Sequence, residues 1–238
     1  MQLNSGVTTQ LLLTLFDVKG IVHLGIAGNA DPGRQIGDVA IPRYWAHTGL
    51  WNWQRYGDGP DDELALEPNG DDTRGKRRRR QQQPAQRVWY QPEVVFPAAS
   101  STPEVREHAF LAPVDDGYYK LSGKLEGLEL ERCVCNGTGT GTACLPRPPA
   151  VARVERSCSA SVFVDNAAYK EFLRDRFCVT AVDMETAAVA LVAAQQGTPF
   201  IAVRALSDLA GSGSAESNEA GSAPEQQGVF WTSMFFAT

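Results

Sequence analysis

The stretch from 179 to 211 constrains the fold of this chain more than any other. It begins with a short apolar run, Val179 to Val182. Residues 187–194 are small, apolar and strongly helix-forming, and Gly197 follows as a helix stop. The unbroken apolar run 200–203 is typical of a strand that is buried on both faces. The stretch therefore predicts one strand–helix–strand unit of an α/β protein.

Polar residues stand where both strands of this unit end. Met184 and Glu185 follow the first strand, and Ser207 and Asp208 follow the second apolar run. In open α/β sheets, ligands bind outside the carboxyl ends of the strands, so the two carboxylates could face one cleft as proton donor and hydrogen-bond acceptor. The spacing also fits a structural reading, in which Glu185 stabilises the helix N-terminus and Asp208 caps the next turn.

Two further charged residues belong to the same unit. Asp183 is a suitable N-cap for the predicted helix. Arg204 stands at the end of a predicted buried strand. Because a buried guanidinium is costly without an opposite charge, we expect Arg204 to have a carboxylate partner.

The N-terminal part reads as a helix, a strand and a tight turn. Apolar residues recur on one helical face over 7–18, residues 21–26 form a strand pattern, and 27–30 are turn-like. Gly25 and Gly28 would let a backbone approach a ligand closely. The third glycine and the following helix of a dinucleotide-binding fingerprint are absent, so no such cofactor is expected.

Length and charge limit the classes of protein. A chain of 238 residues with 43% hydrophobic residues is consistent with one large α/β domain. The net charge of −6 argues against a general nucleic-acid or anionic-membrane binder. No apolar run reaches the roughly 18 residues of a membrane span, and no signal-peptide pattern is present. These observations predict a cytoplasmic protein that binds neither nucleic acid nor membrane.

Five cysteines cannot all be paired within the chain. Cys133 and Cys135 lie close to Cys144 in sequence, but no histidine or fourth cysteine is near, so no zinc site is expected. A disulfide from Cys144 to either of the other two would be expected only in a secreted protein.

Two segments have the composition of disordered chain. The region near 57–87 contains the basic run 76–80 and a glutamine tract, and we interpret it as a solvated insert rather than a nucleic-acid-binding patch. Residues 213–238 begin as a Gly/Ser-rich polar linker. The predicted organisation is one domain over 1–212 with this insert, followed by a flexible tail.

Two motifs carry a resemblance to a known family. Val182-Asp-Met-Glu-Thr-Ala-Ala188 followed by Val203-Arg-Ala-Leu-Ser-Asp208 resembles the signature of the purine nucleoside phosphorylase/nucleosidase superfamily. The chain is most similar to its 5′-methylthioadenosine/S-adenosylhomocysteine nucleosidase branch and to plant bark storage proteins. This resemblance implies a three-layer α/β/α fold with a central mixed sheet, here incomplete. It also implies a purine nucleoside such as 5′-methylthioadenosine as ligand, a homodimer, and no cofactor or metal.

The resemblance also implies roles for single residues. Asp208 would protonate the purine as general acid, Ser207 would orient it, and Glu185 would accept hydrogen bonds from the ribose hydroxyls. Phe163 would stack on the base, although it also fits a core position. The other residues that would line the nucleoside pocket are Met184, Val164, Ile26, Ala27 and Gly28.

The chain departs from the family pattern at both ends. The family's first strand and the following acidic residue, which activates the attacking water, are expected to be missing, and the closing helix is replaced by a different sequence over 229–236. Two functions therefore stay open. One is cleavage of the N-glycosidic bond of purine nucleosides, and the other is a non-catalytic storage-type protein that keeps the fold.

Overall fold

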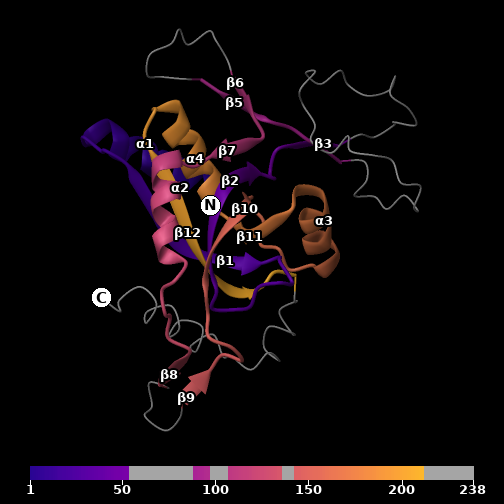
Figure 1. Ribbon diagram of the computed structural model, residues 1–238. Coiled ribbons are helices and arrows are strands. Elements are labelled where there is room, and N and C mark those ends of the chain that lie inside the picture. The colour runs from indigo at the N-terminus through magenta and orange to yellow at the C-terminus, as the bar shows by residue number, and fades with distance from the viewer. Residues whose placement is uncertain (54–87, 97–106, 136–141, 212–238) are drawn as a thin grey trace.

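The structure is a computed structural model that describes residues 1–53, 88–96, 107–135 and 142–211 (Figure 1). The predicted insert near 57–87 and the predicted tail 213–238 lie outside the described residues. Both therefore stay predictions, as does the assignment of 1–212 to a single domain.

The described chain contains short and long elements in a mixed order. From the N-terminus they are α1 (Gln2–Leu15), β1 (Ile21–Asn29), β2 (Val39–His47), β3 (Trp51–Trp53), β4 (Val88–Tyr90), β5 (Glu93–Val95), β6 (Glu107–Ala109), β7 (Leu111–Pro113), α2 (Asp116–Ser122), the 3₁₀ helix η4 (Gly123–Leu125), β8 (Cys133–Cys135), β9 (Thr142–Cys144), β10 (Val151–Ser159), α3 (Ala167–Phe177), β11 (Val179–Asp183), α4 (Thr186–Gln195) and β12 (Phe200–Leu209).

The main sheet has six strands in the order β10-β11-β1-β12-β2-β7. It is mixed, because β1 runs parallel to β12 and antiparallel to β11, while β10 runs parallel to both β11 and β2. The additional pairing of β10 with β2 joins the first five strands of this order into a ring. This closure was not predicted from the sequence.

Helices cover the sheet on two sides (Figure 1). α4 packs on β2 and β12, α1 packs on α4, and α2 lies beside them, whereas α3 packs on β11 at the opposite side. The predicted α/β class, with a central mixed sheet and flanking helices, is confirmed.

The strand–helix–strand unit of β11, α4 and β12 forms as its sequence predicts. The apolar side chains of Val189, Ala190 and Ala193 on α4 pack against Phe200 and Ile201 of β12 in the main core. The helix ends just before Gly197, whose φ of 63° lies in the left-handed region that favours glycine. Propensity, helix stop and core packing agree here, which is why this part could be read from the sequence.

β1 is longer than predicted. The expected tight turn over 27–30 is wrong, because the strand continues to Asn29. Gly28 pairs with Asp208 of β12 on one side and with Val182 of β11 on the other. The two neighbouring strands provide hydrogen-bond partners for backbone N–H and C=O groups that would face water in a turn. This gain outweighs the preference of glycine for turns.

An ion pair between the buried Asp38 and the half-exposed Arg147 lies where strands of the main sheet begin. The carboxylate of Asp38 is fully buried, and it accepts hydrogen bonds from Arg147 Nη2 at 2.6 Å and from the backbone N of Ala150 at 3.0 Å. The backbone O of Asp38 also accepts from Leu206 N at 2.8 Å. One aspartate therefore ties together the starts of β2 and β10 and the middle of β12.

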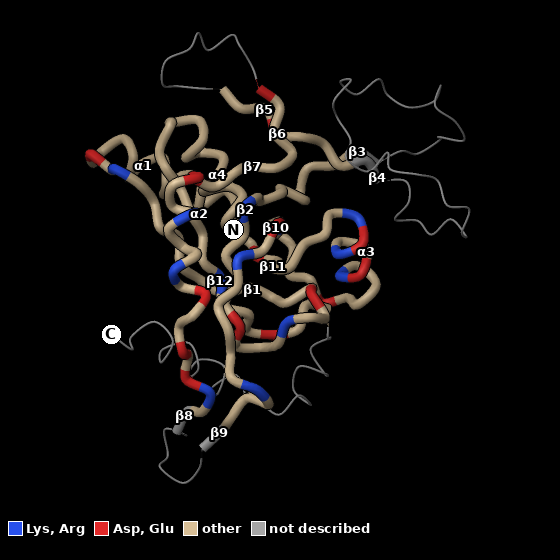
Figure 2. Tube along the Cα trace, viewed as in Figure 1, with Lys and Arg blue, Asp and Glu red and all other residues tan. Residues whose placement is uncertain are grey.

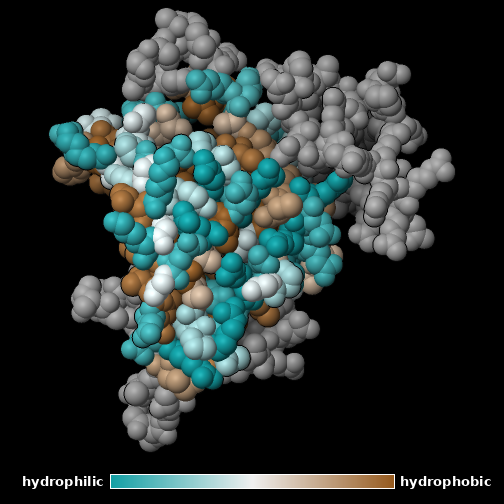
Figure 3. All heavy atoms as spheres, viewed as in Figure 1, coloured by the Kyte–Doolittle hydropathy of each residue, from teal (hydrophilic) through white to brown (hydrophobic). Residues whose placement is uncertain are grey.

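Charged residues lie mainly on the helices and connecting segments, whereas the strands are mostly uncharged (Figure 2). Apolar groups nevertheless reach the viewed surface in patches between hydrophilic ones (Figure 3). Three alternate residues of β1 are among the exposed apolar side chains: Val22 is 62% exposed, Leu24 52% and Ile26 53%. One face of this central strand is thus open to solvent along its length.

Cys133 and Cys144 form a disulfide across the β8–β9 hairpin. The sequence left two partners open for Cys144, and the structure selects Cys133. The sequence predicts such a disulfide only for a secreted protein, and the compartment stays a prediction. Across the described ranges, the structure contains no helix long and apolar enough to span a membrane.

Candidate functional site

Ser207 and Asp208 lie together near the carboxyl end of β12, as predicted. The hydroxyl of Ser207 donates a hydrogen bond to Oδ1 of Asp208 at 2.7 Å. The same hydroxyl lies 3.5 Å from the backbone O of Ala27 on the neighbouring strand β1. Ser207 is buried and Asp208 is half-buried, so the serine fixes one oxygen of a carboxylate that is only partly shielded from solvent.

The adjoining end of β1 carries three of the predicted pocket residues. Ala27 is buried, Gly28 is half-buried, and Ile26 is exposed. The register between β1 and β12 shifts between Ala27 and Gly28, where Ser207 is the residue left out of the pairing. A Cβ atom at Gly28 would lie 3.3 Å from Oδ2 of Asp208 and 3.1 Å from Cβ of Ala210. The absence of a side chain at Gly28 therefore leaves the space that the Asp208 carboxylate occupies.

We expect Gly28→Val to displace this carboxylate. Because misplacing a reacting group by about 1 Å can cost about a hundredfold in rate, any activity that depends on Asp208 should fall by a comparable factor. Gly127→Val is the matched control, since a Cβ at Gly127 would meet no atom within 4 Å. Circular dichroism and the melting temperature of both variants would separate a local effect from misfolding.

Met184 and Glu185 form the turn between β11 and α4. Both are half-buried, and the backbone N of Met184 donates to Oε2 of Glu185 at 3.3 Å. Burial, and then the nearby negative charge of Asp183, raise the pKa of Glu185 above its ordinary value. Glu185 occupies the N-cap position of α4, but its side chain makes no capping hydrogen bond. The predicted structural alternative, in which Glu185 stabilises the helix N-terminus, would therefore act through its charge and not through a capping hydrogen bond.

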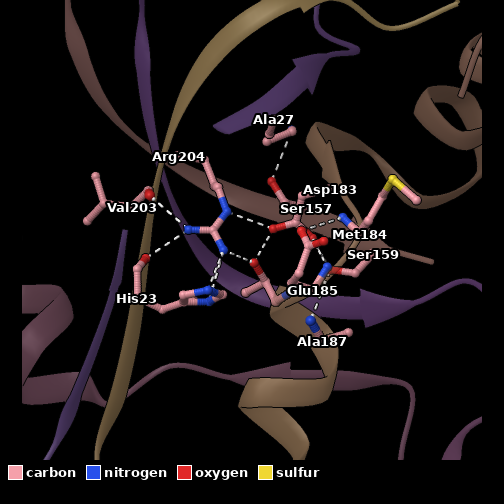
Figure 4. Close-up of polar contacts among 12 residues, drawn as sticks. His23, Ala27, Ser157, Ser159, Asp183, Met184, Glu185, Ala187, Val203 and Arg204 are labelled. Carbon is pink, nitrogen blue, oxygen red and sulfur yellow. Dashed lines mark hydrogen bonds and ion pairs between the residues drawn. The ribbon is translucent and has the colours of Figure 1, made fainter. Parts of the chain in front are cut away.

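Arg204 and Asp183 form a buried ion pair next to this turn (Figure 4). Nε of Arg204 lies 2.7 Å from Oδ2 of Asp183, and both side chains are 2% exposed. The guanidinium also donates to the backbone O of His23 at 2.8 Å, and it lies over the ring of Trp45 with Cζ 5.8 Å from the centroid. The predicted carboxylate partner of Arg204 is thus confirmed, and it is Asp183, the residue that the sequence suggested as helix cap.

His23 is kept neutral by this surrounding. Its ring nitrogens lie 2.9 and 3.2 Å from Nη2 of Arg204. Burial first, and then the positive charge of Arg204, lower the pKa of His23 from 6.5 to about 4.

This shift predicts a loss of stability in mild acid. Between pH 6.5 and about 4 the unfolded chain binds a proton at His23 that the folded chain does not, so the free energy of unfolding falls as the pH falls through this window. The midpoint of urea unfolding, measured across the window, should therefore drop more steeply for the wild type than for His23→Gln. Equal slopes for the two proteins would contradict the assignment.

Phe163 and Val164 lie in the segment between β10 and α3. Val164 is buried, and its backbone O accepts from Gly211 N at 2.7 Å, just after the end of β12. Phe163 is 68% exposed, so the expectation that it also fits the core is wrong. Its neighbour Val164 fills the buried position instead. The exposed ring is available for contact with a ligand.

Most of the predicted residues fall into two groups, one at the ends of β1 and β12 and the other after β11. The first comprises Ser207 and Asp208 with Ala27, Gly28 and, through Gly211, Val164. The second is the Met184–Glu185 turn. Within the described part of the chain, no hydrogen bond links Glu185 to Asp208. Gly28 nevertheless pairs with Asp208 on one side and with Val182, three residues before Glu185, on the other.

Sequence reasoning missed the residues that support these groups. Ser159, Thr186 and His23 contact Asp183 or Arg204. His23 is a lone polar residue in an apolar run, whereas Ser159 lies among other serines and Thr186 directly follows Glu185, so nothing in the sequence singles them out. Only Arg204 carried a signal, because a charge inside an apolar strand requires a partner.

The comparisons with known proteins agree with this fold and these motifs. A sequence model of the phosphorylase superfamily matches residues 3–229. Bark storage protein A of Populus deltoides is 28% identical over 220 residues, which cover 90% of this chain and 64% of that protein. The chain therefore spans less than two thirds of the length of that relative.

Two nucleosidases are also similar to this chain. The 5′-methylthioadenosine/S-adenosylhomocysteine nucleosidase of Marinomonas sp. is 29% identical over 218 residues, covering 92% of this chain and 68% of that enzyme. The solved structure of the enzyme of the same name from Neisseria meningitidis, in complex with methylthio-immucillin-A, superposes with a TM-score of 0.55. That structure is 19% identical, with 98% of this chain and 73% of that chain covered, and the likeness shows the fold. With the family match over most of its length, the chain belongs to the phosphorylase superfamily.

Proposed function

We propose that this protein binds a purine nucleoside at the ends of β1 and β12 and cleaves its N-glycosidic bond. The observation that carries the proposal is the hydrogen bond from Ser207 to Asp208, whose carboxylate fits against Gly28 where a side chain would collide with it. A half-buried carboxyl group that is held in place through one oxygen is suited to give a proton to a bound base.

In this proposal Asp208 protonates the purine at N7, so that the glycosidic bond breaks with a neutral base as leaving group while the ribose becomes oxocarbenium-like. Water in a hydrolase, or phosphate in a phosphorylase, then forms the new bond to C1′ of the ribose. Glu185 accepts hydrogen bonds from the ribose hydroxyls, and Met184 contacts the sugar. Phe163 stacks on the base and the backbone of Val164 binds its edge, whereas Ile26, Ala27 and Gly28 line the pocket. Two observations support these roles: the ring of Phe163 is exposed, and the carboxylate of Glu185 is not used in a capping hydrogen bond of α4.

The substrate class in this proposal is 5′-methylthioadenosine and related adenine nucleosides. It rests on the names of the similar nucleosidases and on the shared motifs. A homodimer remains part of the proposal, and sedimentation equilibrium would test it.

The experiment is release of free adenine from 5′-methylthioadenosine by the folded chain, with and without phosphate. Adenine release that does not depend on phosphate would support a hydrolase, and release that requires phosphate would support a phosphorylase. No release by a sample with native circular dichroism and a cooperative melting transition would overturn the catalytic part of the proposal.

A second candidate is a non-catalytic storage-type protein. The similarity to bark storage protein A over 90% of this chain favours it. The two candidates differ in one observation, because the second predicts nucleoside binding at most, without release of the base.

A further inference from the structure

We propose that the buried pair of Asp183 and Arg204 positions Glu185 for the ribose, so that both are positioning residues of the nucleoside site. The inference rests on the proposed function, in which Glu185 accepts hydrogen bonds from ribose hydroxyls. The new part is that Asp183 and Arg204 fix the backbone of Glu185, so that its carboxylate can bind a ligand.

The carboxylate of Asp183 holds the backbone of Glu185 directly. Its Oδ1 accepts from the backbone N of Glu185 at 3.3 Å and of Thr186 at 3.2 Å. Glu185 therefore cannot turn away from β11 without losing a hydrogen bond to a buried charge.

Two hydroxyls fix the orientation of Asp183 (Figure 4). Ser159, at the end of β10, donates to Oδ1 of Asp183 and accepts from Ala187 N at 2.9 Å. Thr186 donates to Oδ2 of Asp183 and accepts from Nη2 of Arg204. Both hydroxyls are fully buried and use their donor and acceptor sites within the network.

Arg204 determines where the other carboxylate oxygen points. Its Nε binds Oδ2 of Asp183, and its Nη1 is held by the backbone O of His23 and of Val203 at 2.8 and 3.1 Å. The planar guanidinium thus connects β11 to β1 and β12, and it allows few orientations of Asp183. Gly25 lies over this group, since a Cβ there would be 3.1 Å from Nη1.

Asp183 and Glu185 have different roles at the start of α4. Asp183 and Ser159 bind the first backbone N–H groups of α4, which normally need a capping side chain. Glu185 occupies the N-cap position, but its side chain makes no capping hydrogen bond. Among the described residues, the one hydrogen bond to its side chain is donated by Met184 N to Oε2 at 3.3 Å. The geometry therefore fixes the backbone of Glu185, while Oε1 of its carboxylate accepts no hydrogen bond from the described residues.

The test compares the binding of adenosine and 2′-deoxyadenosine by calorimetry. A hydrogen bond from a ribose hydroxyl to a carboxylate should make adenosine bind about tenfold or more tightly than the deoxy compound. Glu185→Ala should abolish this preference. Asp183→Asn, which keeps the size of the side chain but weakens its hold on Glu185 and Arg204, should reduce the preference to about twofold while 2′-deoxyadenosine binding changes little.

Asp38→Asn is the matched control, because it also removes the charge of a buried aspartate paired with an arginine, but in another part of the sheet. It should lower stability and keep the preference for adenosine. If Asp183→Asn does not fold, the double variant Asp183→Asn/Arg204→Met leaves no unpaired charge and is measured instead.

The outcomes separate this inference from the proposed function. A preference that is lost in Glu185→Ala but kept in Asp183→Asn would overturn the positioning role alone. A preference that survives Glu185→Ala would overturn the ribose role of Glu185 within the proposed function. Failure of the wild type to bind either nucleoside would overturn both.

Discussion

Asp208→Asn is expected to reduce release of adenine from 5′-methylthioadenosine by about a hundred- to ten-thousandfold, the usual contribution of a positioned general acid. Asparagine has nearly the same shape and can still accept the hydrogen bond that Ser207 donates at 2.7 Å. It has no acidic proton to give to the base. The effect should therefore lie in kcat, with little change in KM, because nucleoside binding does not need the proton.

The control for this variant is Asp175→Asn, which removes an exposed carboxylate from the surface of α3. It should retain full activity. An Asp208→Asn protein that releases adenine at the rate of the wild type would exclude Asp208 as the acid, even if the protein is a nucleosidase.

Arg204→Met is expected to lower the free energy of unfolding by about 3–5 kcal/mol, the usual cost of breaking one side of a buried ion pair. Methionine fills much of the volume beside Trp45, but it leaves the carboxylate of Asp183 without its charged partner in a site that is 2% exposed. Denaturant unfolding monitored by tryptophan fluorescence measures this loss, provided that the slope with denaturant is unchanged.

Two further proteins check that the loss comes from the unpaired charge. The double variant Asp183→Asn/Arg204→Met removes both charges and should recover part of the stability. Lys19→Met breaks the pair of Lys19 and Asp17, whose side chains are more than four fifths exposed, and should change stability little. A single Arg204→Met variant as stable as Lys19→Met would contradict the buried pair.

The part of the fold that could be predicted is the part whose determinants are local. The helix α4 and the strands on either side of it follow from small apolar residues, a glycine stop and an unbroken apolar run. These signals lie within about thirty residues and do not conflict with the core that surrounds them.

The rest depends on pairings between distant segments. β1 continues through Gly28 because β11 and β12 supply backbone partners from more than 150 residues away. Closure of the ring requires β10 to pair with β2, and neither sequence contains a sign of its neighbour. Apolar patterns identify strands, but they do not determine which strands meet.

In the candidate site, too, contacts between sequence neighbours could be predicted and contacts between distant strands could not. Ser207 and Asp208 are adjacent in the chain, so their hydrogen bond follows from a single motif. The fit of Gly28 against Asp208 and the hold of Asp183 on Glu185 depend on how β1, β11 and β12 are placed. The exposure of Phe163 was missed because an aromatic residue next to valines is more often buried.

Nucleoside binding at the ends of β1 and β12 is the central claim, and it is compatible with both candidate functions. Titration calorimetry of 5′-methylthioadenosine with the folded wild type, Gly28→Val and Gly127→Val measures it. The account predicts saturable one-site binding to the wild type and to Gly127→Val, and its loss in Gly28→Val, where a side chain would occupy the space beside Asp208. Absence of binding to the folded wild type, or equal binding by all three proteins, would contradict it.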